Sequence, residues 1–347
     1  MNTVILSSDN KQNITICAEA IAGGELVAIP TETVYGLGAN ALNEKAVAKI
    51  FITKGREPDN PLIVHIAELS QVENLVSEIP ETFYTLAEKF WPGPLTIIMK
   101  SNGIVPDNVT AGLETIAIRM PNHPATLALI RTSGCPLAAP SANLSGSPSP
   151  TKAIHVRNDI DGRIPYILDG GDCEVGLEST VLDISEATPR ILRPGGITHD
   201  QLTALLGTVE IETSTGDETY KPRSPGMKYR HYAPGAPMTA ITGPADMTAE
   251  YIKKQMDLSE GIAALMFDDY APAHPNVVTF GASDDLSAQA ANLFDALRKL
   301  DKLDSSQIFA QVPSPEGLGL AIANRIIKAS GNNVIEITCF LDNKHVK

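Results

Sequence analysis

Short apolar runs alternate with amphipathic stretches along the first 207 residues, which is the pattern of an α/β protein. Each run is bounded by Gly, Pro or polar residues and therefore predicts a buried strand. Predicted strands cover 26–29, 62–64, 95–99, 115–119, 136–139, 166–168 and 181–184. Apolar positions at helical spacing predict helices at 14–21, 82–89, 124–131 and 199–206. We expect a twisted, open, mixed sheet with helices packed against it.

The pattern changes after residue 207. A polar stretch, 208–236, contains basic and aromatic residues at 224–234 and is typical of a linker. Strands and helices then alternate again. Strands are predicted at 238–241, 261–266, 277–280 and 307–311, and helices at 247–256, 286–303 and 317–328. The sequence thus predicts a first domain (1–207), a linker (208–236) and a smaller α/β domain (237–347).

Polar side chains occupy every second position of the segment 139–150. They are Ser141, Asn143, Ser145, Ser147 and Ser149. Prolines within the segment favour extended geometry, in which alternate side chains share one face. This interpretation predicts a row of hydroxyls at a strand end, where open α/β sheets bind ligands. The alternative is a solvated loop.

Charge limits the kind of ligand. The 347-residue chain has a formal net charge of −14 at pH 7, and acidic residues outnumber basic ones in both predicted domains. A broad basic surface for nucleic acid is therefore not expected, so an anion would be bound by a few focused cations. No apolar run is long enough to cross a membrane. The four cysteines are dispersed, which favours a reducing, cytoplasmic setting and no structural metal.

Four cations lie at loops and strand ends. Lys54 and Arg56 flank one glycine and can point toward the same anion, a pairing suited to phosphates. Arg119 ends the predicted strand 115–119, and Arg193 follows another apolar run. These residues predict an anion site that works by positioning and charge stabilisation.

The segment 30–41 has a second interpretation. Thr31, Thr33 and Tyr35 alternate, which predicts one hydroxylated face. Residues 36–41 also fit the dinucleotide fingerprint G-x-G-x-x-G/A. The acid that should end the next strand lies instead in the charged, proline-broken loop 54–61, which disfavours a nicotinamide site. No nucleotide-triphosphatase phosphate loop, nucleophile elbow or kinase signature set is present in the sequence.

Eight motifs occur together and in a fixed order. They are PTETVYGLG (30–38), KGR (54–56), PLIVH (61–65), WPGPLT (91–96), AIRMP (117–121), APSANLSG (139–146), LESTV (177–181) and LRPG (192–195). The set resembles the threonylcarbamoyl-AMP synthase family, whose enzymes begin the threonylcarbamoylation of tRNA. The segment SPGMKYRHYAP (224–234) resembles the linker of the long, two-domain form.

The resemblance implies a cytoplasmic nucleotidyltransferase of tRNA processing. L-threonine, bicarbonate and ATP would give L-threonylcarbamoyl-adenylate and pyrophosphate, with Mg²⁺ accompanying ATP. The product would pass to the tRNA threonylcarbamoyl transferase complex, with weak or indirect tRNA binding. The second domain would be a smaller, Rossmann-like α/β domain.

The resemblance also implies roles for individual residues. Those expected to hold ATP are Lys54, Arg56, Asn60, Thr115, Ser141, Asn143, Ser149 and Arg193, of which Lys54 and Arg56 are expected to be catalytic. Those expected to hold L-threonine are Thr33, His65, Arg119 and Ser179. Tyr229, His231 and Tyr232 would belong to a flap that closes over the site.

Two other classes of function remain open at this point. One is an RNA-binding module without catalysis, against which the acidic balance counts. The other is a nicotinamide-dependent oxidoreductase, which would bind its dinucleotide at 36–41 and would not depend on threonine.

Overall fold

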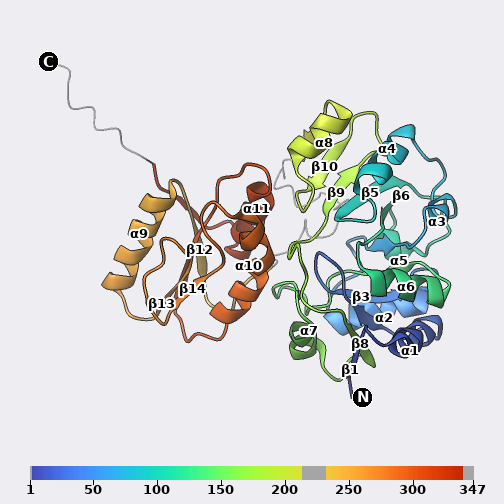
Figure 1. Ribbon diagram of the computed structural model, residues 1–347, viewed down its shortest axis with the longest axis horizontal. Helices are drawn as coiled ribbons and strands as arrows, with labels where there is room; N and C mark the ends of the chain where they lie inside the picture. The colour runs from blue at the N-terminus through green and yellow to red at the C-terminus, as the bar shows by residue number, and fades with distance from the viewer. Residues whose placement is uncertain (1, 213–231, 339–347) are drawn as a thin grey trace. The chain divides into compact units, whose positions relative to one another are not determined.

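The chain divides into two compact units, Met1–His231 and Tyr232–Lys347 (Figure 1). The computed structural model describes residues 2–212 and 232–338. Most of the predicted linker lies outside these ranges, so the limits of the three predicted parts stay predictions. None of the helices in the described ranges has the length and apolarity needed to cross a bilayer.

The first unit is built on a mixed sheet of eleven described strands. In spatial order they are β1 (Val4–Ser7), β8 (Tyr166–Asp169), β2 (Val27–Ile29), β3 (Gly36–Asn40), β7 (Leu137–Ala138), β4 (Ile63–His65), β6 (Thr115–Arg119), β5 (Leu95–Lys100), β9 (Thr180–Asp183), β10 (Arg190–Arg193) and β11 (Glu210–Ile211). The sheet contains both parallel pairs, such as β4 with β6, and antiparallel pairs, such as β5 with β6. The expected mixed α/β architecture is confirmed.

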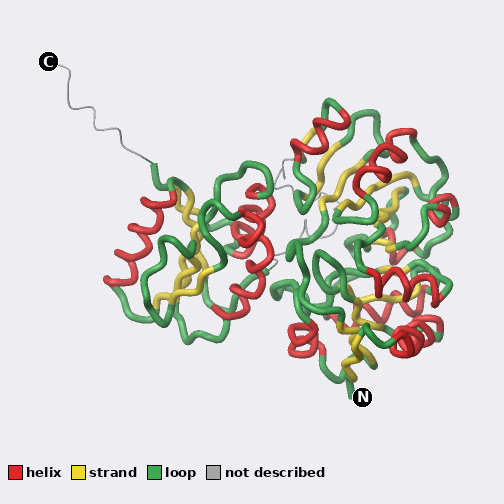
Figure 2. Tube along the Cα trace, in the orientation of Figure 1, coloured by secondary structure: helices red, strands yellow, loops and turns green. Residues whose placement is uncertain are grey.

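Helices pack around this sheet (Figure 2). They are α1 (Lys11–Ala22), α2 (Glu44–Lys54), α3 (Ser70–Glu73), α4 (Glu81–Phe90), α5 (Asp107–Thr110), α6 (Pro124–Ser133), α7 (Ala153–Ile160) and α8 (His199–Leu206). Local chemistry sets the ends of α2. The side chain of Asn43 accepts hydrogen bonds from two backbone N–H groups of the first turn, and Gly55 ends the helix at φ 61°.

Two apolar cores cover opposite faces of the sheet. On β2, Ala28 belongs to one core, whereas Val27 and Ile29 belong to the other. The alternation follows from the pleat of a strand, which points successive side chains to opposite faces. This strand reads as a continuous apolar run because both of its faces are buried.

The structure overturns one disfavoured alternative and one expectation from the sequence in this unit. Residues 36–40 form strand β3, so the dinucleotide fingerprint is not the turn between a strand and a helix that a nicotinamide site requires. The segment 139–150 is not extended throughout. The side chain of Asn143 donates to the carbonyls of Leu144 and Ser147, both at 2.8 Å, and Gly146 adopts φ 92°. The chain therefore turns, and its serines do not share one face.

The second unit is a small α/β domain with a parallel sheet, as expected. The strand order is β14 (Val277–Thr279), β13 (Ile262–Met266), β15 (Gln307–Gln311), β12 (Met238–Thr242) and β16 (Val334–Glu336). Every neighbouring pair is parallel. Its helices are α9 (Ala245–Leu258), α10 (Leu286–Leu300) and α11 (Gly319–Ala329). The core cluster around Ile241, Ile252 and Phe309 belongs to this unit alone.

Candidate functional site

Strand register brings His65 and Arg119 to the same face of the sheet. They are paired at the ends of the parallel strands β4 and β6. Two residues earlier on each strand, Ile63 and Ala117 form a small apolar cluster with side chains of β5, β9 and β10. The intervening Val64 belongs to the main core on the opposite face. Because alternate residues of a strand share a face, His65 and Arg119 project beside the small cluster.

Arg119 is only 3% exposed, and three groups hold its guanidinium. Its Nη1 donates to the hydroxyl of Thr33 at 2.8 Å, and its Nε donates to the carbonyl of Gly93 at 3.2 Å. Nη2 lies 2.7 Å from a carboxylate oxygen of Glu32. The hydroxyl of Thr33 is also 2.8 Å from that of Thr31. The guanidinium is therefore fixed in place, as an anion clamp must be.

His65 stands beside Arg119 as a neutral group. Its Nδ1 lies 3.2 Å from the carbonyl oxygen of Ile63. Burial, reinforced by the positive charge of Arg119, lowers the pKa of His65 to about 3. At neutral pH the imidazole offers hydrogen bonding without adding charge to the site.

Lys54 ends α2 and points its ammonium at the segment 139–150. Its Nζ donates to the carbonyls of Ser141 at 2.5 Å and Asn143 at 2.6 Å. Burial, together with the nearby charge of Arg56, lowers the pKa of Lys54 to about 7. Arg56 itself donates from Nη2 to the carbonyl of Asn60 at 3.0 Å. The structure thus brings these five predicted residues together.

Two amides of this group have unused hydrogen-bonding atoms. Asn60 is fully buried, and neither its amide nitrogen nor its amide oxygen has a hydrogen-bond partner among the residues that the structure describes. The Oδ1 atom of Asn143 is likewise buried, with no partner in the described part of the chain. Buried polar atoms are rarely left in this state, so these atoms are candidates to contact a ligand.

Ser149, Ser179 and Arg193 form a third group. Ser149 donates to Glu178 Oε1 at 2.6 Å. The next residue, Ser179, has its hydroxyl 2.8 Å from that of Thr96 on β5. Arg193, at the end of β10, donates from Nη2 to the carbonyl of Ser179 at 3.0 Å and to its hydroxyl at 3.2 Å. Residues 178–179 therefore connect Ser149, in the segment 139–150, to the buried cation Arg193.

The segment 31–36 connects the Arg119 group with the Lys54 group. Thr33 is bonded to Arg119 as described, while the backbone of Tyr35 bonds Ala142 and Pro150, each at 2.8 Å. Gly36 then pairs with Ser141 in an isolated bridge. The Tyr35 hydroxyl donates to the carbonyl of Gly171 at 2.8 Å and so does not continue the hydroxyl row of Thr31 and Thr33.

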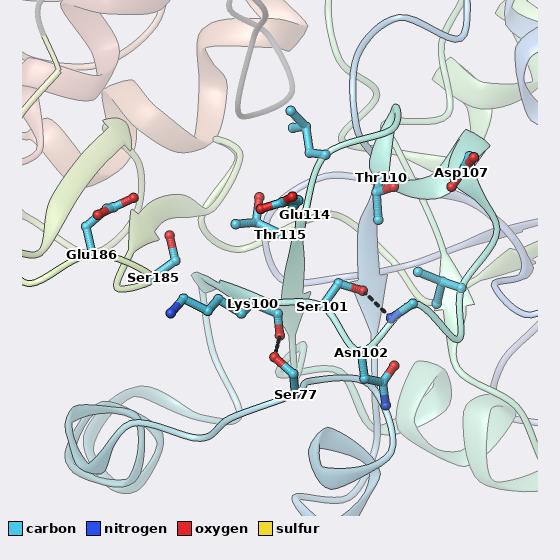
Figure 3. Close-up of a pocket in the computed structure, with 13 residues that line it drawn as sticks. Ser77, Lys100, Ser101, Asn102, Asp107, Thr110, Glu114, Thr115, Ser185 and Glu186 are labelled. Carbon is cyan, nitrogen blue, oxygen red and sulfur yellow. Dashed lines mark hydrogen bonds between the residues drawn. The ribbon is translucent and has the colours of Figure 1, made fainter.

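Thr115 is not brought into these contacts. It begins β6, four residues from Arg119, which corresponds to roughly 13 Å along an extended strand. It pairs with Lys100 and lines a separate pocket of about 530 Å³ (Figure 3). Other residues lining this pocket include Asp107, Glu114 and Glu186, so its charge is mainly acidic. Thr115 still shares the sheet face of Arg119, because the two are an even number of residues apart.

The expected flap residues are only partly described. Tyr232 belongs to the second unit, where its ring packs against Phe294 at 5.1 Å between centroids and beneath the guanidinium of Arg325. Tyr229 and His231 lie outside the described residues.

Sequence reasoning missed Glu32, Thr96 and Glu178 as members of these groups. Each lies inside a motif that was noted for its neighbours: Glu32 between two hydroxyl residues, Thr96 after a Pro-Gly-Pro turn, and Glu178 before Ser179. For Glu32 and Glu178 the available signal was a carboxylate inside an otherwise uncharged, buried motif, since carboxylates are almost never buried unless paired. Among the described residues no group of three His, Cys, Asp or Glu side chains is arranged to hold a metal ion.

Comparison with known proteins gives consistent matches. Residues 19–195 match the Sua5/YciO/YrdC family model, described as "Telomere recombination", and residues 197–331 match "Threonylcarbamoyl-AMP synthase, C-terminal domain". The chain is 49% identical over 332 residues to threonylcarbamoyl-AMP synthase of Bacillus subtilis, covering 94% of this chain and 96% of that protein. Identity to the Pyrococcus abyssi protein of the same name is 45% over 329 residues, covering 93% and 96%.

A solved structure agrees with this fold over both units. The crystal structure of P. abyssi Sua5 complexed with L-threonine has a TM-score of 0.91 and 43% sequence identity, covering 97% of this chain and 100% of that one.

The fold and the site define a two-unit α/β protein with focused cations and hydroxyls on one sheet, suited to anionic ligands. Within that class, the chain belongs to the threonylcarbamoyl-AMP synthase family. The resemblance seen in the eight motifs is therefore confirmed, as is the expectation of an enzyme with this activity. The nicotinamide alternative is wrong, because β3 occupies the fingerprint.

Proposed function

We propose that the chain condenses L-threonine, bicarbonate and ATP into L-threonylcarbamoyl-adenylate with release of pyrophosphate. The observation that carries this proposal is the chain of contacts from Arg119 through Thr33 and residues 35–36 to Ser141 and Lys54. It supports the proposal that a carboxylate clamp and a phosphate clamp share one connected framework. The threonine complex of the similar P. abyssi Sua5 supports the choice of amino acid.

The amino acid would bind at the Arg119 group. Arg119 would pair with the threonine carboxylate, and Thr33, neutral His65 and Ser179 would line the pocket around its remaining polar atoms. A neutral imidazole and hydroxyls suit the hydroxyl of threonine, which needs hydrogen-bonding partners rather than charge.

ATP would bind at the other cations. Lys54, Arg56 and Arg193 would face the phosphates. The amide of Asn60 and the Oδ1 atom of Asn143 would bind the nucleotide together with Ser141 and Ser149. Thr115 would contribute further along the same face of β6. Mg²⁺ would enter with the triphosphate, where it neutralises phosphate charge.

The chemistry follows from placement and charge. The threonine ammonium first loses its proton, and the free amine and bicarbonate then give a carbamate and water. A carbamate oxygen attacks the α-phosphorus of ATP and displaces pyrophosphate. Negative charge then develops on both the attacking and the leaving side of the phosphorus. Lys54 and Arg56 lie together at the end of α2, where fixed positive groups stabilise such charge without reorganisation.

The product would be consumed by the tRNA threonylcarbamoyl transferase complex in the cytoplasm, with tRNA bound weakly or indirectly by this chain. Mass spectrometry of the products from ATP, L-threonine and ¹³C-labelled bicarbonate tests the proposed reaction. A threonylcarbamoyl-adenylate heavier by one mass unit than the unlabelled product, absent when any substrate is omitted, is the expected result. Tight, salt-sensitive binding of tRNA without pyrophosphate release would favour the RNA-binding alternative instead.

A further inference from the structure

Glu32 is a buried carboxylate that none of the expected roles uses. It is 5% exposed, and it lies on the loop between β2 and β3, one residue before Thr33. One oxygen is 2.7 Å from Arg119 Nη2, yet neither carboxylate oxygen accepts a hydrogen bond from the residues that the structure describes. A carboxylate removed from water in this way has unused acceptor capacity at the clamp for the amino acid.

The ionisable groups around Glu32 determine which ligand charge it can pair with. Burial lowers the pKa of His65 to about 3 and also lowers the pKa of His123, which lies near Glu32. Burial raises the pKa of the neighbouring Cys173 thiol to about 12. At neutral pH these three groups are therefore uncharged, and Glu32 and Arg119 form a compact pair of opposite charges.

A ligand carboxylate at Arg119 would upset that balance. Arg119 and Glu32 cancel when the site is empty, so a bound carboxylate alone would leave one buried negative charge in excess, which is costly. An α-amino acid avoids the excess because its ammonium and its carboxylate are attached to the same carbon. Its ammonium can face Glu32 while its carboxylate faces Arg119, because these two side chains lie 2.7 Å apart.

We propose that Glu32 is a specificity-determining residue that binds the α-ammonium of the amino acid whose carboxylate pairs with Arg119. This inference rests on the proposed function for the identity of the amino acid, L-threonine. Glu32 then selects α-amino acids against otherwise identical acids that lack the positive charge. Its oxygens without hydrogen-bond partners supply the charge-assisted acceptors that the ammonium needs.

Calorimetric binding in the absence of ATP tests the proposal with two ligands, L-threonine and (2S,3R)-2,3-dihydroxybutanoate, in which a hydroxyl replaces the ammonium. The full-length protein should bind threonine at least about tenfold more tightly than the dihydroxy acid. Glu32→Gln should weaken threonine binding by about 10- to 100-fold, the range for a hydrogen bond to a charged group. The same variant should bind the dihydroxy acid as well as or better than the parent, because Arg119 loses a competing carboxylate.

A purely structural role gives a different result. If Glu32 only holds Arg119 in position, Glu32→Gln changes the affinities for both ligands in the same direction and by similar factors, which would overturn the proposal. Glu32→Asp keeps the charge and should keep the preference for threonine, which makes the test informative even if the glutamine variant folds poorly. Glu68→Gln is the matched control, since Glu68 pairs with Arg131 on the surface and should leave both affinities unchanged.

The steady-state readout separates this proposal from the proposed function. With saturating ATP and bicarbonate, Glu32→Gln should raise KM for threonine by a similar 10- to 100-fold and lower kcat much less. If the parent protein makes no threonylcarbamoyl-adenylate, the proposed reaction fails, while the binding comparison still decides the role of Glu32.

Discussion

At the residue scale, the site depends on positive side chains that have been removed from water. Burying a charge is expensive unless it is paired, and the chain meets this requirement differently at its two clamps. Arg119 has a carboxylate beside it, whereas the ammonium of Lys54 is held by two backbone carbonyls. The weaker compensation at Lys54 explains why burial lowers its pKa to about 7 while the lysine remains in place.

This lowered pKa predicts proton uptake when ATP binds. Above pH 7 the empty site holds Lys54 mostly as the neutral amine, and the phosphates of ATP favour the charged form. At pH 8, binding should therefore draw in a large fraction of a proton per site, as expected for a group whose pKa lies below the pH. Isothermal titration calorimetry in buffers of different ionisation enthalpy measures this number.

Lys54→Arg is the matched control, because an arginine stays protonated in proteins and should give no uptake at pH 8. Binding without proton uptake in the parent protein would mean that Lys54 does not face the phosphates. Because ATP binding takes up a proton, the affinity for ATP should weaken as the pH rises from 7 to 9 in the parent and not in the arginine variant.

Arg56 offers a second test at this scale. Arg56→Ala removes the proposed charge-assisted phosphate contact and should lower the rate of pyrophosphate release on the order of 100-fold, comparable to the loss of one preorganised donor. The loss should appear mainly in kcat, because the charge acts on the displaced pyrophosphate. Turnover close to that of the parent would remove Arg56 from the site.

At the element scale, the sequence predicts best where one physical signal dominates. Strand β6 (115–119) and helix α8 (199–206) have the predicted bounds, since each shows one clear periodicity. Strand β3 was missed because its alternating glycines have low strand propensity and fit a phosphate-binding turn. The segment 139–150 was predicted to be extended because the hydrogen bonds of the Asn143 side chain, which fold it back, depend on its three-dimensional setting.

The same limit applies to the site. The motifs identified Arg119, Thr33, Lys54 and Ser141 as candidates, and the structure places them in direct contact pairs. Sequence alone could not show that Glu32 pairs with Arg119, because 87 residues separate them and the pairing depends on the strand order β3-β7-β4-β6. The roles assigned to individual residues in holding ATP or threonine stay predictions.

Gly195 tests how tightly the turn after β10 supports the site. A Cβ at this position would lie 2.3 Å from the backbone nitrogen of Thr180 and 2.4 Å from the carbonyl carbon of Ser179. Gly195→Ala should therefore displace Ser179 from Arg193 and lower the free energy of unfolding by about 1–3 kcal/mol. Thermal denaturation and the KM for threonine measure the two effects.

Gly235→Ala is the matched control for this substitution. The nearest atom to its new Cβ would be Asp301 Oδ1 at 3.7 Å, an ordinary contact. The control should change stability by no more than about 0.5 kcal/mol. An unchanged melting temperature and KM in Gly195→Ala would show that the backbone around Ser179 can move without consequence.

At the scale of the whole molecule, each unit has its own apolar core. The clusters around β2, β4 and β6 contain only residues of the first unit, and the cluster around Ile241 and Phe309 contains only residues of the second. Deletion of residues 221–347 should therefore leave a folded first unit. Because the expected flap residues are lost, formation of threonylcarbamoyl-adenylate should be impaired.

Circular dichroism with thermal melting, followed by the product assay, checks both halves of this expectation. A cooperative transition with reduced product is the expected result. Full activity in the truncated protein would show that the removed residues act only as a tether and a separate domain.

The short segment 31–36 is bonded on one side to Arg119, the proposed amino-acid clamp, and on the other to the loop that contacts Lys54, in the proposed phosphate clamp. When two ligands are held by the same stretch of backbone, the binding of one affects the binding of the other. Whichever arrives first reduces the entropy that the second must remove, and thermodynamic linkage makes the benefit equal in both directions. Bound threonine should thus increase the affinity for ATP by the same factor by which bound ATP increases the affinity for threonine.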